Sequence, residues 1–318
     1  ILSYELLAVS YAGIGRFDKA QEVIESLKDV TSKSSLVHLT KGMILHSQKE
    51  FDKAIEECQK SIAIDEDNPL ALYAIGRIYI DKKEYDKAEE YLKKAAGNEP
   101  ELASAYTGLG ISYLLQGNAG ESFKNYNKAL EINQDEHMAR MGLATIFIGL
   151  KGYENAIEQY KLVIKKIPTF IRARQNLAAL YLQIGRFQDA IVQSGEILKI
   201  DPKIAPVYLI LARSYSYSDN FYDAVKNIRK FIDLQESSYE GHYLLGVFLM
   251  ASGDNNSAKK ALEKSISDSR EIFELASKSN SKAAEIIGKQ ATECVKECSK
   301  QAANLSKKKP SSANANAA

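Results

Sequence analysis

Three stretches of ten residues, GRFDKAQEVI at 15–24, KEFDKAIEEC at 49–58 and KEYDKAEEYL at 83–92, are near copies of one another. Each begins thirty-four residues after the one before it. A fixed period of this length is typical of proteins built from stacked supersecondary units. We therefore number the chain in units of thirty-four residues, the first of which starts at Ile1.

Two positions of the unit hold small residues in all eight copies. Position eight holds Ala8, Gly42, Gly76, Gly110, Ala144, Ala178, Ala212 and Gly246. Position twenty holds Ala20, Ala54, Ala88, Ser122, Ala156, Ala190, Ala224 and Ala258. Two helices approach closely only where their side chains are short, so these positions predict a tight helix crossing in every unit.

The remaining pattern of the unit predicts two helices joined by a turn. Apolar residues recur at steps of three and four, which is the helix period, and no segment alternates as a strand does. Glycines mark the middle of several units, at Gly15, Gly117, Gly185 and Gly253. Prolines fall at position thirty-two, where a helix must end before the next unit begins, at Pro100, Pro168 and Pro202.

These residues resemble the thirty-four-residue signature of the tetratricopeptide repeat family. One well-matched copy contains Tyr106, Leu109, Gly110, Tyr113, Tyr126 and Ala129. The resemblance covers eight units, over residues 1–272, without an insertion. It implies an all-α fold, a right-handed superhelix of paired helices, and a role as a binding scaffold. Fold alone does not determine function, however.

Composition excludes several classes of function. The formal net charge of +1 gives no overall attraction to nucleic acid, so we expect no nucleic-acid partner. An uncharged apolar run such as GLATIFIGL at 142–150 is too short to span a bilayer. No phosphate-binding glycine loop is present, and the four histidines show no metal-ligand spacing. We therefore expect a non-catalytic protein without cofactor or metal.

The three cysteines are too few for a disulfide framework. Cys58 lies on the inner face of a unit and is interpreted as a small buried hydrophobic residue. Cys294 and Cys298 are four residues apart, so they share one face of a helix. A paired-thiol or metal site is one interpretation of this pair. Simple packing is favoured, because no third or fourth ligand is nearby in the sequence.

The family resemblance implies that the first helix of each unit lines a concave groove. We expect this groove to bind a protein or peptide through Leu36, Leu39, Met43, His46, Tyr73, Arg77, Ile111, Leu114, Met138, Met141, Tyr243 and Met250. All four methionines fall in this set, and methionine adapts well to apolar partners. The alternative is that some of these side chains complete the core between units. Some arrays of this family carry asparagine at position six of successive units. This chain lacks that regular series, because position six holds Asn only at Asn176.

The pattern changes after residue 272. An apolar stripe at Ala283, Ile287, Ala291, Cys294, Cys298, Ala302 and Leu305 predicts an amphipathic helix over 273–306. Its first turns are expected to cap the last unit, while the rest could pair with another copy, lie on an apolar surface or fold back into a groove. Residues 307–318, with the sequence KKKPSSANANAA from 307, are expected to be disordered.

Two functions remain open at this stage. The first is an interaction scaffold that binds an apolar peptide or helix segment and helps to assemble a bacterial multiprotein complex, since the repeats resemble bacterial scaffolds in their Lys, Ile and Asn content. The second is a self-assembling structural or coat protein that uses its C-terminal helix or an open repeat end. The chain begins inside a helical pattern, which suggests a truncated or processed N-terminus. A cytoplasmic location is favoured, and a periplasmic or envelope location stays open.

Overall fold

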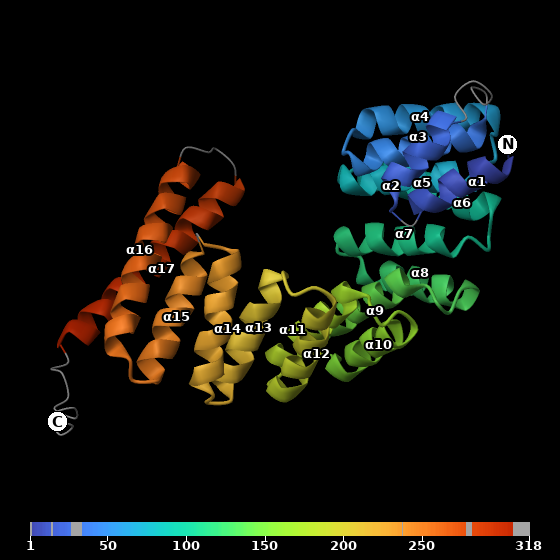
Figure 1. The fold of residues 1–318 in the computed structure, drawn as a ribbon. Helices are drawn as coiled ribbons and strands as arrows, with labels where there is room; N and C mark the ends of the chain where they lie inside the picture. The colour runs from blue at the N-terminus through green and yellow to red at the C-terminus, as the bar shows by residue number, and fades with distance from the viewer. Residues whose placement is uncertain (1, 14, 27–33, 237, 278–281, 308–318) are drawn as a thin grey trace. The chain divides into compact units, whose positions relative to one another are not determined.

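The computed structural model describes residues 2–13, 15–26, 34–236, 238–277 and 282–307. The described residues form seventeen α-helices and no strand, which confirms the predicted all-α fold (Figure 1). They fall into two compact units, Ile1–Lys166 and Ile167–Ala318. In each unit the helices pack in consecutive pairs, as the two small positions of the repeat predict.

The first unit contains five helix pairs. Their bounds are α1 Leu2–Gly13, α2 Phe17–Ser26, α3 Ser35–Ser47, α4 Phe51–Ile64, α5 Pro69–Asp81, α6 Tyr85–Asn98, α7 Ala103–Leu115, α8 Ala119–Ile132, α9 His137–Gly149 and α10 Tyr153–Lys166. The first helices of neighbouring pairs also contact each other, in the order α1, α3, α5, α7 and α9. These first helices therefore form a continuous layer within the unit.

The second unit contains three pairs and one further helix. Their bounds are α11 Ile171–Gln183, α12 Phe187–Ile200, α13 Ala205–Tyr217, α14 Phe221–Leu234, α15 Tyr239–Ala251, α16 Asn255–Ser277 and α17 Lys282–Lys307. Helix α16 continues past residue 272, where the eighth repeat was expected to end. Helix α17 packs against α16 and α15. Of the predicted disordered tail, residues 308–318 lie outside the described residues.

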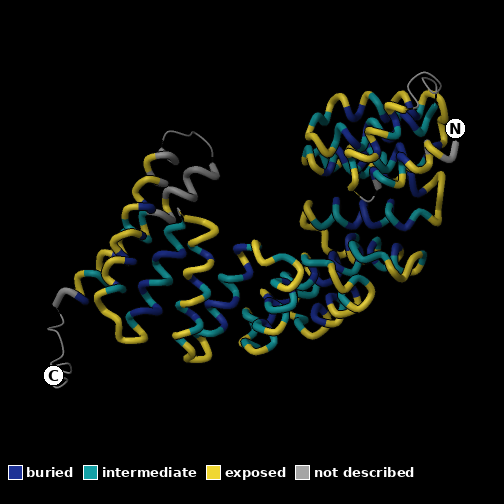
Figure 2. The backbone as a smooth tube through the Cα atoms, in the orientation of Figure 1, coloured by how far each residue is buried: buried dark blue, intermediate teal, exposed yellow. Residues whose placement is uncertain are grey.

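Small side chains make the close approach within each pair possible. The alanines at position twenty, from Ala20 to Ala258, are wholly buried. Ser122 replaces this alanine in the fourth repeat, and its hydroxyl donates a hydrogen bond to the Gly110 carbonyl over 2.7 Å. Figure 2 shows that buried positions are spread along the helices of each unit and are not gathered in one core. Stability in such an array comes from contacts between neighbouring repeats.

In the third and fourth repeats, the side chain at position twenty-four fills the space between one repeat and the next. In the fourth repeat this residue is Tyr126 of α8, which is 1% exposed. Its ring lies between Gly110 of α7 and Gly142 of α9, and a Cβ at Gly142 would lie within 2.6 Å of three atoms of the tyrosine side chain. Leu92 lies in the same way between Gly76 and Gly108. The glycines at positions six and eight thus leave room for this residue.

A residue in the left-handed conformation follows the end of every first helix, at position fifteen of the repeat. Position fifteen has a positive φ in all eight repeats, at Gly15, Lys49, Lys83, Gly117, Lys151, Gly185, Asp219 and Gly253. In the third repeat the Lys83 amide donates to the Ile80 carbonyl and the Glu84 amide to the Tyr79 carbonyl, both over 2.9 Å. This pair of hydrogen bonds is the Schellman motif, which satisfies the last carbonyls of a helix. The turn is therefore constant even where the glycine is absent.

Candidate protein-binding groove

A pocket of about 310 Å³ opens on the first helices of the first three repeats. It is lined by Val9, Ala12, Phe17, Leu39, Gly42, Met43, His46, Leu70, Tyr73, Ala74, Arg77 and Ile78. These residues come from α1, the start of α2, α3 and α5. Five of the predicted groove residues, Leu39, Met43, His46, Tyr73 and Arg77, are thereby brought together at one place.

Apolar side chains form most of this pocket. Leu39 is 1% exposed and lies at its base, whereas Met43 is half-buried and packs against a core cluster that includes Ala12 and Ile44. Leu70 is 38% exposed at the start of α5. An exposed apolar side chain beside a half-buried methionine offers surface that a partner can cover, because burying apolar area is the main driving force for association.

Polar groups accompany the apolar residues. The Arg77 guanidinium donates a hydrogen bond to the Tyr73 hydroxyl over 3.0 Å. The pKa of Arg77 is raised, mainly by Tyr73 and to a smaller extent by Asp81. Burial acts in the opposite direction but does not outweigh them, so the guanidinium stays charged. His46 Nε2 lies 2.7 Å from Asp81 Oδ2. Arg77 is the residue with a fixed charge among those that line the pocket.

The other predicted groove residues of the first unit lie outside this pocket. Met141 of α9 is 7% exposed, and Met138 and Leu36 are half-buried. Ile111 and Leu114 of α7 pack against a core cluster that contains Tyr126 and Leu143. Ile111 and Leu114 thus pack against the core, which was the alternative role considered for some of the groove side chains.

In the second unit, α17 covers the predicted groove positions of the eighth repeat. Tyr243 and Met250 pack against a cluster that includes Cys298 and Leu305 of α17. The Gln301 side-chain amide also donates to the Tyr243 hydroxyl over 3.4 Å. Tyr243 is therefore in contact with the chain's own C-terminal helix, and Met250 packs against a cluster to which that helix contributes.

Several pocket residues were not among those predicted, including Val9 and Phe17. Val9 occupies position nine of the first repeat, so the groove pattern would have included it if it had been extended to residues 1–34. Phe17 is the first residue of α2, and it also lines the pocket. The sequence gives no sign of this second role, because the same position is aromatic in most repeats.

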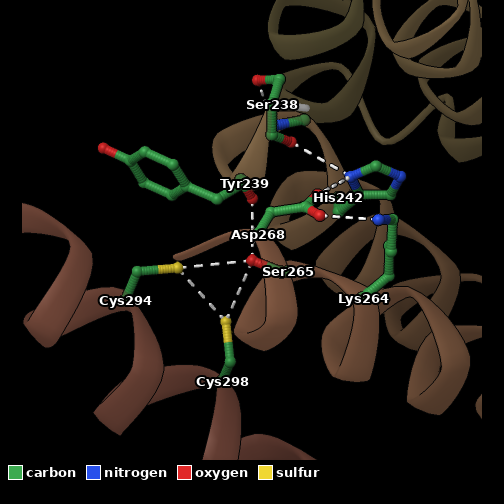
Figure 3. Close-up of polar contacts among 9 residues, drawn as sticks. Ser238, Tyr239, His242, Lys264, Ser265, Asp268, Cys294 and Cys298 are labelled. Carbon is green, nitrogen blue, oxygen red and sulfur yellow. Dashed lines mark hydrogen bonds and ion pairs between the residues drawn. The ribbon is translucent and has the colours of Figure 1, made fainter. Parts of the chain in front are cut away.

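A buried carboxylate joins α15 and α16. Asp268 is 3% exposed, and its oxygens lie 2.7 Å from Lys264 Nζ and 2.9 Å from His242 Nδ1 (Figure 3). The same histidine nitrogen is 3.2 Å from the Ser238 carbonyl. The pKa of Lys264 is raised because it donates a hydrogen bond to Asp268. The Lys264 ammonium on the same helix thus pairs with the buried Asp268 charge, and the His242 ring of α15 lies beside the carboxylate.

Within the described ranges, no group of three or more His, Cys, Asp or Glu side chains is arranged to hold a metal ion. Of the helices described, none is both long and apolar enough to cross a membrane.

Models of the tetratricopeptide repeat match residues 6–69, 45–109, 103–136 and 239–267. Together these segments span half of the chain, and both units contain a match. The chain belongs to the tetratricopeptide repeat family. Proteins of this family typically mediate protein–protein interactions and are generally non-catalytic. No curated protein sequence matches the chain.

Solved tetratricopeptide structures share the fold at low identity. A tetratricopeptide repeat protein from Parabacteroides merdae is 17% identical, with a TM-score of 0.53 over 82% of this chain and 100% of that one. PilF from Pseudomonas aeruginosa is 19% identical, with a TM-score of 0.50 over 63% and 91% of the two chains. A chain of the APC/C hetero-tetramer Cut9–Hcn1 is 16% identical, with a TM-score of 0.50 over 86% and 59%. The likeness concerns the fold alone.

Proposed function

We propose that this tetratricopeptide protein is a non-catalytic interaction scaffold, and that the pocket of α1, α3 and α5 binds an apolar peptide or helix segment of a partner protein. The observation that carries the proposal is the convergence of Leu39, Met43 and Tyr73 with Arg77 in one pocket. Binding sites in proteins are commonly concave, apolar and supplied with a few fixed polar groups.

The pocket suggests what its occupant presents. A volume of about 310 Å³ is at the lower end of ligand pockets and suits one or two large side chains of a peptide. The Arg77 guanidinium has donors beyond the one that it gives to Tyr73, because a guanidinium carries five N–H groups. We therefore infer an apolar anchor next to a carboxylate or a backbone carbonyl that accepts from Arg77.

The finer part of this proposal is that the scaffold assists the assembly of a bacterial multiprotein complex, and it rests on the composition of the repeats. The alternative is self-assembly through the C-terminal helix or an open repeat end. Self-assembly through the C-terminal helix has less support, because Cys298 and Leu305 of α17 are buried against the chain's own last repeat.

Met43→Glu is expected to weaken peptide binding at least about tenfold, which corresponds to ~1.4 kcal/mol. The new carboxylate would lose its hydration in the complex without gaining a partner. The probe is a peptide selected from a random library displayed on phage by panning against the whole protein. Its affinity for wild type and variant is measured by fluorescence anisotropy.

Ile64→Glu is the matched control for this measurement. Ile64 ends α4, the second helix of the repeat that holds Met43, and it is 48% exposed. The control should bind the selected peptides as wild type does, and both variants should melt at the wild-type temperature. Equal binding by wild type and Met43→Glu would contradict the proposed groove.

A further inference from the structure

Cys294 and Cys298 bring two sulfur atoms together where α17 meets α16. They lie one helical turn apart on α17, and their Sγ atoms are 3.5 Å from each other. The Ser265 Oγ of α16 lies 3.4 Å from each sulfur. Figure 3 shows the three atoms as a closed triangle. The pair belongs neither to the groove nor to the helix crossings of the repeat.

The two thiols differ in their access to solvent. Cys298 is wholly buried, in the cluster that also contains Leu262 and Leu305. Cys294 is half-buried, so a small reagent can reach it. One sulfur is therefore accessible, and the second lies directly behind it.

The hydrogen bonds of the triangle favour a negative charge on the accessible sulfur. The hydrogen bond between the two thiols is the main reason that the pKa of the Cys294 thiol is lowered, and the Ser265 hydroxyl contributes to the same effect. Ser265 also donates to the Tyr239 carbonyl over 2.8 Å, and it can turn to the sulfur when Cys294 loses its proton. The proton that remains stays on Cys298, whose pKa is raised because Cys294 accepts its hydrogen bond.

Cys58 provides a contrast within the same chain. It is wholly buried in α4, with the core residues Ile75 and Ile78 in the same cluster. Burial raises the pKa of the Cys58 thiol to about 12. Reactive cysteines are partly exposed thiolates, whereas buried thiols with raised pKa values are inert.

We propose that Cys294 and Cys298 form a modification site for hydroperoxides, in which Cys294 is the nucleophile and Cys298 the resolving thiol. The Cys294 thiolate attacks the terminal peroxide oxygen, the O–O bond breaks, and a sulfenic acid forms as hydroxide leaves from hydrogen peroxide or an alkoxide from an alkyl hydroperoxide. Cys298 then attacks that sulfur, its thiol proton leaves with the displaced hydroxyl as water, and a disulfide forms. The peroxide is reduced, and the two thiols are oxidised. A low-pKa accessible cysteine beside a resolving cysteine is the usual arrangement of such sites.

Formation of the disulfide would disturb the seating of α17. In a helix, residues four apart have Cβ atoms about 5–6 Å apart. A disulfide requires a Cβ separation of about 3.5–4.5 Å. The turn from Cys294 to Cys298 must therefore distort, and Cys298 must shift within the cluster that holds α17 on the last repeat. Because Tyr243 and Met250 pack against that cluster, we infer that oxidation uncovers these two groove positions.

The test treats the whole protein with hydrogen peroxide and follows each cysteine by mass spectrometry of proteolytic peptides. Cys294 should react at least about tenfold faster than Cys58 and should end in a disulfide with Cys298, as a loss of two hydrogens. Trypsin should then cleave α17 faster than in the reduced protein, and reduction with dithiothreitol should restore the original rate. Cys298→Ser should stop at a sulfenic acid that dimedone traps at Cys294.

Wild type alone is enough to overturn the proposal. Equal reaction rates at Cys294 and Cys58 would show that the triangle does not activate the thiol. A sulfenic acid that persists at Cys294 in wild type, or a disulfide between two chains, would show that Cys298 does not resolve it. A disulfide that leaves cleavage of α17 unchanged would refute the inferred release of the helix.

Discussion

Gly142→Ala is expected to lower the free energy of unfolding by about 2–3 kcal/mol, because one added methyl group collides with a ring that cannot move away. The new Cβ would lie within 2.6 Å of three atoms of the Tyr126 side chain. Tyr126 is 1% exposed and is also held on its other face by Gly110. The measurement is urea unfolding of the whole protein, followed by circular dichroism.

Two controls separate this collision from a general effect of removing glycine. Gly195→Ala lies in the middle of α12 with no atom within 4 Å of the added Cβ, so it should raise stability by about 0.5–1 kcal/mol. Tyr126→Leu combined with Gly142→Ala should cost much less than the sum of the single changes, because the smaller side chain removes the collision. Strict additivity in this cycle would contradict the packing described for Tyr126.

Met141→Glu is expected to destabilise the protein by about 3 kcal/mol or more at neutral pH. Met141 is 7% exposed, so the new carboxylate would be buried. Burial raises the pKa of such a carboxyl in the folded state. The folded state then binds a proton more readily than the unfolded state, so the deficit should shrink as the pH falls from 7 toward 4.

Met141→Leu and Met43→Glu are the controls for this change. The first keeps the site apolar at similar volume and should cost less than about 1.5 kcal/mol. The second places the same charge at a half-buried position that borders the pocket and should leave the melting temperature nearly unchanged. A melt of Met141→Glu that matches wild type would mean that this residue belongs to an open surface.

Local spacing was enough to predict the repeated helix pairs. The small residues at positions eight and twenty required a close crossing, and they lie at one. The turn at position fifteen was predicted from four glycines, yet Lys83 and three other residues adopt the same left-handed conformation. The hydrogen bonds of the helix end are strong enough to impose this conformation on a lysine, so composition alone underestimates how regular the turn is.

Contacts between repeats were harder to predict. Gly108 and Gly142 at position six matter because the Leu92 and Tyr126 side chains lie beside them. The sequence offers no general rule for this pairing, since Tyr160 stands at position twenty-four as Tyr126 does and is followed by Asn176 at position six. The contact becomes visible only when the helix that fills the space is known.

The candidate groove was predicted only in part, because contacts between repeats decide which of its side chains are exposed. Periodicity identifies the face of a helix, but the depth of Leu39 and Met141 depends on neighbouring repeats. Tyr243 and Met250 are covered by a helix that lies outside the repeat pattern. The cysteine pair was visible in the sequence, whereas Ser265, which completes the triangle, is 29 residues from Cys294. Its one signal is that position twenty-seven is apolar in the three repeats before it, at Val163, Ile197 and Phe231.

The most direct test of the proposed function maps where a bound peptide lies. A peptide from the phage selection, synthesised with a benzophenone in place of its apolar anchor, is cross-linked to the whole protein by light, and the attachment sites are found by mass spectrometry. The proposal predicts attachment to α3 and α5, at or next to Met43 and Tyr73, and loss of the cross-link in Met43→Glu but not in Ile64→Glu. Attachment confined to second helices such as α4 and α6, with equal yield in Met43→Glu, would contradict it.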